Sequence, residues 1–506
     1  MGTYYRNGHG RFFADDGVAC MHPFDGDGMI SATTFDPVNN RILFRNKYVE
    51  TKAYVTDKAT GTMSQRGIFG TMRSGGLFAN IGRTDFKNLA NTNVLYANDT
   101  LYALWEGGRP HELDPLTLCN RNGPGDSGET NLDGLLSGEK DTFSAHPRYD
   151  PKNNVWVNFG VAFDPSSGYS TIRLFEMDAT TFQSKKRETS IVSKGPGFFH
   201  DFILTDNYII FNVNETQMNN NKALKALLGL SGFANTIEVN PDADATLIVL
   251  IPRSILENDA EGSSVDIDVV EDTRVKAIPV ENHFNFHFGN AFEDGNGNVV
   301  FDTVRADEID LDMASDGRPL WDNEDVFDGV YPTKLVRYTL DIENGCVSKS
   351  LPPKIIVSHG PEFPSIPKQL STKESRYMYP VAPHTTNVST TGKGSGPAGS
   401  IMKADAHDPN LNEMYSFQAN EFPGEVAFVP KKGKDVSKPE EEDAGYLILQ
   451  CVVVEGNEKR TDLLIFDVEG RGSLEAGPIS RMQLPTFIPH ALHGSFVEGL
   501  TFEFEI

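Results

Sequence analysis

The chain has 506 residues, of which 39% are hydrophobic, and its formal net charge is -26 at pH 7. A chain of this length can bury a large core, either as one domain or as several. The strong negative charge, without a basic patch, argues against nucleic-acid binding and indicates a soluble surface that binds anionic lipid weakly.

The first half of the chain reads as short strands separated by turn residues. Strands are expected over 41–44, 48–55, 155–163, 170–177 and 208–213. No alternation of helices and strands occurs, so a doubly wound sheet is excluded. Repeated strand–turn–strand units over this length favour a closed radial arrangement, which protects the sheet edges.

One segment in the middle of the chain departs from the strand pattern. Residues 222–233 contain good helix formers and many apolar side chains. One interpretation is a short helix packed on the strands. The other is an exposed apolar patch that contacts a membrane surface, formed by Leu227, Leu228, Leu230 and Phe233.

The second half returns to strands, which are expected over 299–303, 446–454 and 463–468. The low-complexity segment 385–400 is interpreted as a loop between repeated units, and no linker divides the chain. Nothing approaches a run of roughly 18 apolar residues, and no signal peptide or transit-like leader is visible. We expect a soluble or membrane-peripheral intracellular protein, with cytoplasm and plastid both left open.

Four histidines stand beside Gly, Pro or aromatic residues at the ends of expected strands: His146, His200, His287 and His493. A single histidine among Phe residues is usually a core residue. Four in similar surroundings indicate one shared metal, because neutral imidazole suits iron, copper or zinc. Their wide separation excludes a zinc finger, so only a fold that gathers distant strand ends could assemble them.

Together with these segments, five further motifs resemble the carotenoid cleavage oxygenase family. They are Arg6-Asn-Gly, Phe24-Asp-Gly-Asp-Gly-Met, Asn91-Thr-Asn, Leu104-Trp-Glu-Gly-Gly and Gly424-Glu-Val-Ala-Phe-Val-Pro. The motifs follow the family order along the whole chain. The resemblance implies an all-β fold, a seven-bladed β-propeller with a helical and loop cap over an axial metal site. It also implies a single domain over 1–506 and leaves a missing short N-terminal segment open.

The resemblance further implies roles for individual residues. One Fe(2+) per chain would be bound by His146, His200, His287 and His493, with O2 as co-substrate. Three glutamates would orient the imidazoles: Glu106 for His200, Glu362 for His287 and Glu425 for His493. Thr92 would crowd the sixth coordination position with its methyl group. One departure is Ser365, which stands where many relatives have Arg.

The implied reaction is the oxidative cleavage of a C=C bond in a carotenoid or apocarotenoid, an apolar polyene, into two carbonyl products. Within the family, the alternative is a dioxygenase that cleaves lignostilbene or resveratrol. Stilbene-cleaving members place a lysine directly before the first orienting glutamate, whereas this chain has Trp105 there. An indole cannot hold a phenolate, which favours the polyene. A non-catalytic, lipid-binding propeller is the alternative from another class.

Overall fold

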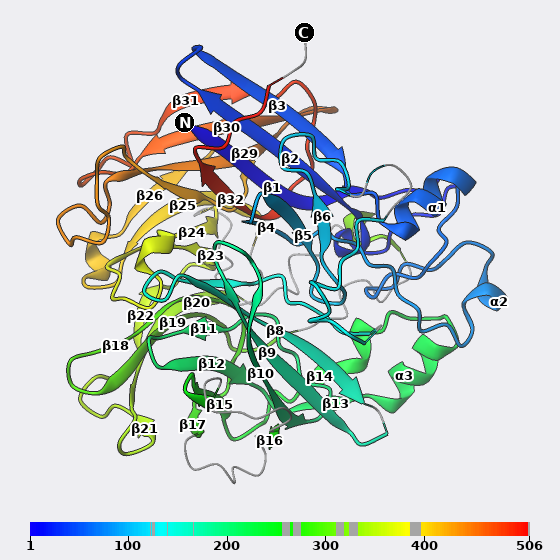
Figure 1. Ribbon diagram of the computed structural model, residues 1–506, viewed down its shortest axis with the longest axis horizontal. Coiled ribbons are helices and arrows are strands. Elements are labelled where there is room, and N and C mark those ends of the chain that lie inside the picture. Colours follow the sequence, from blue (N-terminus) through cyan, green and yellow to red (C-terminus); the bar gives the residue numbers. More distant parts are fainter. Residues whose placement is uncertain are drawn as a thin grey trace.

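The computed structural model describes residues 1–503, apart from 122, 124–126, 139, 165, 256–263, 267–274, 310–317, 323–331 and 385–395. Within these residues, seven sheets of three to five strands stand around one axis and form a seven-bladed β-propeller (Figure 1). The predicted fold class is therefore confirmed.

The blades are numbered here in ring order from the one that contains both chain ends. Blade one comprises β3 (Arg41–Tyr48), β2 (Asp27–Asp36), β1 (Gly2–Arg11) and β32 (Ala491–Glu498). Blade two comprises β4 (Asn93–Ala97), β5 (Thr100–Leu104) and β6 (His111–Leu113). Blade three comprises β7 (Arg148–Asp150), β8 (Val155–Asp164), β9 (Tyr169–Asp178), β10 (Ser184–Lys194) and β16 (Ser264–Asp266). Blade four comprises β11 (Ile203–Leu204), β12 (Tyr208–Val213), β15 (Thr246–Pro252) and β17 (Lys276–Val280).

The remaining blades follow the same plan. Blade five comprises β18 (Phe284–Glu293), β19 (Asn298–Ala306), β20 (Thr333–Asp341), β21 (Cys346–Val347) and β22 (Lys354–Val357). Blade six comprises β23 (Glu362–Ser365), β24 (Tyr377–Pro383), β25 (Ala398–Asp405) and β26 (Glu413–Ser416). Blade seven comprises β27 (Glu421–Pro423), β28 (Ala427–Pro430), β29 (Gly445–Glu455), β30 (Glu458–Asp467) and β31 (Pro478–Gln483). A separate hairpin joins β13 (Thr216–Met218) to β14 (Ile237–Val239).

The ring closes by pairing the two ends of the chain. β1 and β32 are antiparallel, with Thr3 opposite Val497 and Tyr4 opposite Phe496. The β32 strand also lies beside β4 of blade two and β28 of blade seven. The last strand is therefore held on both flanks, and the ring has no gap between its first and last blades.

Apolar side chains from neighbouring blades interlock to form the core. Alternate residues of β8 point to one face of blade three and pack against β12 of blade four. Phe159 meets Phe202 and Phe211 edge to face, with ring centroids 5.3 and 5.2 Å apart. Each such aromatic pair adds about 0.5–1.5 kcal/mol beyond the area that it buries.

The strands expected from residue 155 onward are confirmed. Most of their expected ends lie within one or two residues of the observed ends. The strand expected over 48–55 was wrong, because β3 ends at Tyr48 and α1 (Lys52–Thr60) begins shortly after. The Thr51 side chain accepts a hydrogen bond from Tyr54 N at 3.1 Å and so caps this helix. A local cap therefore overrode the strand-like composition of the segment.

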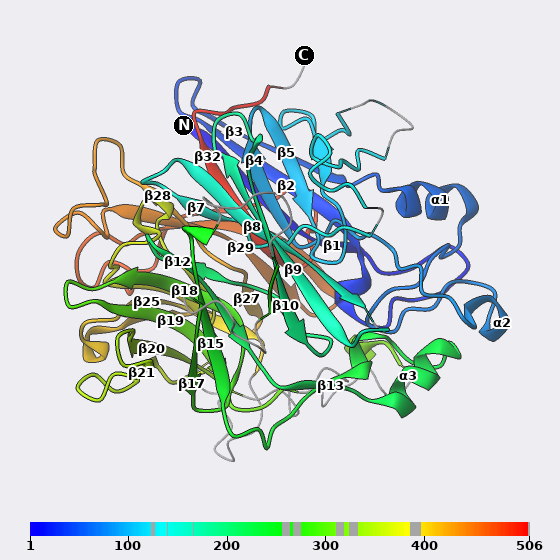
Figure 2. The ribbon, with the colours of Figure 1, turned by 60° about the horizontal axis from the view of Figure 1, so that its bottom comes forward.

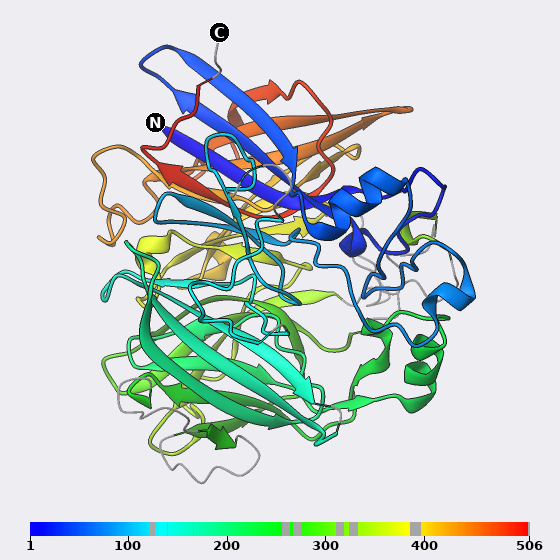
Figure 3. The same cartoon turned by 45° about the vertical axis from the view of Figure 1, so that its right-hand side comes forward.

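The helices gather on one side of the ring and form the cap. α1 and α2 (Leu77–Asn80) lie in the connection from β3 to β4, and α3 (Asn220–Leu227) lies between β13 and β14 (Figures 1 and 3). After rotation, α2, α3 and β13 remain on the same side (Figure 2). The helix expected over 222–233 is thus present, although it starts and ends earlier.

We had expected the low-complexity segment to lie between two blades, but it lies within one. It connects β24 to β25, which pair antiparallel within blade six, with Val381 opposite Ile401. Residues 385–395 of the segment lie outside the described part of the chain. The interpretation as a loop holds only in the sense that the segment joins two adjacent strands of one sheet.

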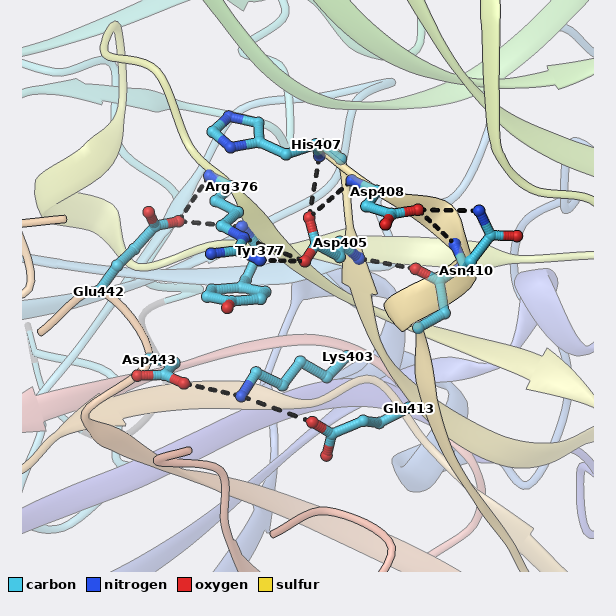
Figure 4. A network of polar contacts seen from close by, with 12 residues as sticks. Arg376, Tyr377, Lys403, Asp405, His407, Asp408, Asn410, Glu413, Glu442 and Asp443 are labelled. Atoms are coloured by element: carbon cyan, nitrogen blue, oxygen red, sulfur yellow. Dashed lines mark hydrogen bonds and ion pairs between the residues drawn. The ribbon is translucent and has the colours of Figure 1, made fainter. Parts of the chain in front are cut away.

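A polar network ties blade six to blade seven (Figure 4). Lys403 of β25 is buried and lies 2.7 Å from Asp443 and 3.9 Å from Glu413. Its ammonium also donates to the carbonyl oxygens of Val468 and Gly470. A buried lysine is stable here because carboxylates and carbonyls surround it.

Replacing Lys403 with Met should destabilise the protein by about 3–5 kcal/mol, because Asp443 and Glu413 lose their cationic partner in a buried setting. Chemical denaturation would measure the change. The control is Lys438→Met, since Lys438 is exposed and its nearest carboxylate, Asp435, lies 4.0 Å away. The control should change stability by less than about 0.5 kcal/mol. Equal effects of the two substitutions would contradict this role.

Candidate metal centre

Four blades each bring one histidine to the axis. His146 lies two residues before β7, His200 lies three residues before β11, His287 lies within β18, and His493 lies within β32. One ring nitrogen of each histidine lies within 4.8 Å of the corresponding nitrogen of all the others. The structure thus gathers all four histidines singled out from the sequence.

The nitrogens are spaced as ligands of one ion would be. His200 Nε2 lies 3.0 Å from His146 Nε2 and 3.3 Å from His287 Nε2. Bonds of about 2.0–2.1 Å from imidazole to a divalent ion would place neighbouring nitrogens about 3 Å apart. The donor set therefore fits a single first-row metal ion, and nitrogen-only donors disfavour magnesium and calcium.

Three glutamates orient three of the imidazoles. Nδ1 of His200 donates to Glu106 at 2.5 Å, Nδ1 of His287 to Glu362 at 2.6 Å, and Nδ1 of His493 to Glu425 at 2.8 Å. Each bond places the proton on Nδ1 and leaves the Nε2 lone pair free to bind a metal. His146 has no such carboxylate among the described residues; its backbone N–H donates to Ser144.

Burial and these carboxylates shift the pKa values in opposite directions. Burial, reinforced by the neighbouring imidazoles, holds the pKa of His146 well below its ordinary value. Burial also lowers the pKa of His493, although Glu425 opposes it. Burial alone would lower the pKa of His200, but the Glu106 carboxylate outweighs it and raises that pKa.

Arg6 completes the charge pattern. Its guanidinium lies 2.6 Å from Glu425 Oε2 and donates to the Leu492 carbonyl at 2.7 Å. Burial would raise the pKa of Glu425, but His493 and Arg6 bring that pKa below its ordinary value. Three carboxylates and one guanidinium leave two negative charges without a fixed cation. A divalent ion would balance these two charges, so the residues fit a metal ion in charge as well as in spacing.

Asp201 links three of the segments that carry histidines. Its Oδ2 accepts from the backbone N–H of Phe288 at 2.9 Å and from the guanidinium of Arg148. Asp201 follows His200, Phe288 follows His287, and Arg148 lies two residues after His146. One carboxylate therefore fixes the relative positions of three histidines through their backbones.

The backbone beside Glu362 adopts an uncommon conformation. Phe363 has φ 54°, in the left-handed region that few residues other than Gly adopt, and the strand register shifts between Glu362 and Ser365. The Phe363 ring lies 5.1 Å from that of His287 and 5.2 Å from that of His493. The bulge thus places both a carboxylate and a packing ring against the metal centre.

Thr92 is buried beside the centre. Its carbonyl oxygen accepts from His493 N at 3.1 Å, and its hydroxyl donates to Asn91 Oδ1 at 3.2 Å. Thr92 also lines the large cavity described next. The predicted steric role of its methyl group at the metal stays a prediction.

Two cavities adjoin the metal centre and share His287 and His493 in their walls. The larger has a volume of about 1000 Å³ and apolar walls that include Trp105, Phe198, Phe286 and Phe363. The smaller, of about 250 Å³, is more polar and borders His146, Arg148 and Asp201. Of these two cavities, the larger one has room for a long apolar ligand.

Comparison with known proteins agrees with this geometry. The family model described as retinal pigment epithelial membrane protein matches residues 1–498. The chain belongs to this family, which is the carotenoid oxygenase family predicted from the sequence. Apocarotenoid-15,15'-oxygenase of Synechocystis sp. is 34% identical, over 98% of this chain and 90% of that protein.

Other members of the family show how far the similarity extends. Chloroplastic carotenoid cleavage dioxygenase 7 of Arabidopsis thaliana is 27% identical, over 97% of this chain and 84% of its own length. Resveratrol cleavage oxygenase 1 of Aspergillus fumigatus is 26% identical, over 94% and 85%. The crystal structure of cobalt-substituted Synechocystis ACO has a TM-score of 0.80 and 32% identity, over 98% of this chain and 92% of that one.

Sequence reasoning noted the Arg6 motif but gave Arg6 no role, and it missed Asp201. The partners of Arg6 lie 419 and 486 residues away, so no local pattern could reveal them. Asp201 directly follows His200, and an acid beside a proposed ligand was the available signal.

Changing Glu106 to Gln should lower metal affinity about 10–100-fold, because the amide no longer draws the proton of His200 onto Nδ1. Metal content after dialysis against graded chelator would measure this, with His200→Ala as the more severe variant. Glu293→Gln is the control, since Glu293 accepts from Thr205 and Asn207 away from the centre. Full metal retention by both Glu106→Gln and His200→Ala would exclude a metal at these histidines.

Proposed function

We propose that this chain is an iron(II)-dependent dioxygenase that cleaves one C=C bond of an apocarotenoid or carotenoid into two carbonyl products. The main support is that three members of the four-histidine group, His200, His287 and His493, lie in the wall of an apolar cavity of about 1000 Å³. The names of the Synechocystis and Arabidopsis relatives support the substrate class. We also propose that residues 1–506 form one propeller domain.

In this proposal, His146, His200, His287 and His493 hold the iron. When bound, iron(II) would activate dioxygen, and each new carbonyl carbon would receive one oxygen atom. Glu106, Glu362 and Glu425 keep three of the imidazoles in the metal-binding tautomer through the bonds described above.

The cavity walls position the polyene. Trp105, Phe286 and Phe363 provide flat apolar surfaces beside the histidines, which would hold a conjugated chain in one register. Thr92 would limit the space next to the iron. The apolar lining excludes water from the bond that is to be cleaved, and no general acid or base is needed among the lining residues.

A stilbene substrate is less well supported. Trp105 lies in the cavity wall and carries no charge that could hold a phenolate. The resveratrol-cleaving relative has lower identity, 26% against 34% for the apocarotenoid oxygenase. A non-catalytic lipid-binding propeller would use the same cavity, and product analysis separates it from an enzyme.

Incubating the iron-loaded protein with carotenoids, apocarotenoids and resveratrol under oxygen tests the reaction. We expect aldehyde pairs from one or more polyenes and none from resveratrol, identified by mass spectrometry. Incubation under 18O2 should label both products, because each carbonyl receives an atom of dioxygen. Cleavage of resveratrol alone would favour the stilbene alternative, and no cleavage by iron-replete protein would favour the binding protein.

We propose that the cap contacts a membrane through an apolar patch on α3. Leu227, Leu228 and Leu230 are exposed, Leu230 to 61%. Phe233 differs from these three, because it packs half-buried against Phe86 with ring centroids 4.8 Å apart. On α2, Phe78 is 91% exposed and extends the patch, since Gly82 N, two residues after α2, donates to Leu227 O at the end of α3.

The described residues include no helix that is long and apolar enough to cross a bilayer. Any contact would therefore be peripheral, and the apolar patch would let a lipid-soluble substrate reach the cavity. The segment after α3 lies against the cavity lining, because Ala234 N donates to Ile68 O beside Phe69. The patch and one part of the cavity wall are thus in contact.

Replacing Leu227, Leu228 and Leu230 with Ser should reduce liposome binding by at least about 100-fold, since about 1.5–3 kcal/mol of transfer free energy is lost for each leucine that would be fully buried in the membrane. Vesicle co-sedimentation would measure this. Turnover of a detergent-solubilised substrate should stay unchanged. Ile479→Ser, at an exposed residue of β31, is the control. Unchanged vesicle binding of the triple variant would contradict membrane contact through this patch.

A further inference from the structure

Three histidines besides the four at the metal centre line the apolar cavity: His9, His22 and His490. His9 and His22 are buried, 8% and 5% exposed, whereas His490 is exposed. Gly8 of β1 pairs with Ala491 of β32, so His9 and His490 occupy facing positions at the end of this ladder. Polar rings at these positions are unexpected in a wall built mainly from aromatic residues.

The buried imidazoles of His9 and His22 are uncharged at neutral pH, because burial lowers the pKa of each ring. Burial, with His490 and His22 nearby, lowers the pKa of His9 to about 3. Burial lowers the pKa of His22 to about 4. The cavity wall therefore offers neutral donors and acceptors here, and no imidazolium that would pair with an anion.

The hydrogen bonds already made define what is left for a ligand. His22 Nδ1 accepts from Phe24 N at 3.0 Å, so the proton of His22 is on Nε2. His490 Nε2 donates to the Pro423 carbonyl at 3.0 Å. Within the described residues, neither ring nitrogen of His9 has a partner, and nothing accepts from His22 Nε2. A buried imidazole without partners is costly unless a ligand satisfies it.

These histidines lie toward one end of the cavity. His9 contacts Phe12, with ring centroids 5.6 Å apart, and Phe12 contacts Trp321 at 5.5 Å. Trp321 and Phe13, which also line the cavity, are 40% and 55% exposed. The exposed rings mark a mouth, so His9 lies between solvent and the metal centre.

We propose that His9 and His22 form a binding subsite for an uncharged oxygen atom, a hydroxyl or carbonyl, at the outer end of the polyene substrate. The proposal rests on the proposed function and narrows its substrate class to oxygenated polyenes. A hydroxyl or carbonyl oxygen can accept from His22 Nε2–H, and His9 can donate to it or accept from a hydroxyl. A site that hydrogen-bonds such a group discriminates against the analogue that lacks it, because its buried nitrogens stay unpaired.

Equilibrium binding under anaerobic conditions tests the subsite without any turnover. The probes are β-apo-8'-carotenal, its ring-hydroxylated derivative and the matching hydrocarbon, and binding to the iron-loaded protein is followed by quenching of tryptophan fluorescence. His9→Phe keeps the ring packing on Phe12 but removes both nitrogens, and His9→Gln restores polar atoms. His111→Phe is the matched control, because His111 is buried on β6 outside the cavity.

We expect His9→Phe to weaken binding of an oxygenated probe about tenfold and that of the hydrocarbon by less than threefold. His9→Gln should recover much of the loss, and His111→Phe should change nothing. A loss confined to the ring-hydroxylated probe would place the ring oxygen at His9, whereas a loss for both aldehydes would place the chain-end oxygen there. Equal changes for all three probes would overturn the subsite.

The same experiment separates this proposal from the proposed function. If the wild-type protein prefers oxygenated probes anaerobically but yields no aldehydes under oxygen, the subsite stands and the reaction fails. If it cleaves polyenes but binds the hydrocarbon as tightly as the aldehyde, the reaction stands and the subsite fails.

Discussion

Three hydrogen bonds between imidazoles and carboxylates are the constraint on which the rest of the structure depends. Each joins two different blades. Glu106 of blade two reaches His200 before blade four, Glu362 of blade six reaches His287 of blade five, and Glu425 of blade seven reaches His493. An imidazole without its acceptor could turn or change tautomer. The metal centre and the blade arrangement therefore stabilise each other.

The same bonds explain how an apolar cavity can adjoin a charged centre. Imidazole nitrogens face the position of the ion, while the carboxylates that would balance its charge lie behind three of the rings and accept from Nδ1. The guanidinium of Arg6 neutralises the charge of one of these carboxylates, Glu425. Glu106 and Glu362 also reach the cavity wall, but each carboxylate is hydrogen-bonded to an imidazole, and most of the wall is apolar. An uncharged, elongated ligand is the kind of molecule that such a cavity accepts.

Much of the fold could be predicted from the sequence, because β-branched and aromatic runs such as 446–454 are buried strands with unambiguous turns. The four histidines and three glutamates were found through motifs. Local rules failed at Thr51, where a helix cap outweighed strand composition. They also could not reveal Arg6 and Asp201 as organising residues, since those roles depend on contacts between blades. The left-handed backbone at Phe363 likewise results from a bulge that the composition of the segment does not predict.

The pairing of β1 with β32 has a consequence for how the protein matures. His493 lies in the last strand of the propeller, so during synthesis three of the four histidines leave the ribosome long before the fourth. The nascent chain cannot present a complete set of ligands, and the strand that seals the ring emerges at the same time as the final ligand. A complete set of ligands for a metal therefore exists only after β32 has been made, and a polypeptide truncated before β32 would lack both closure and the full coordination set.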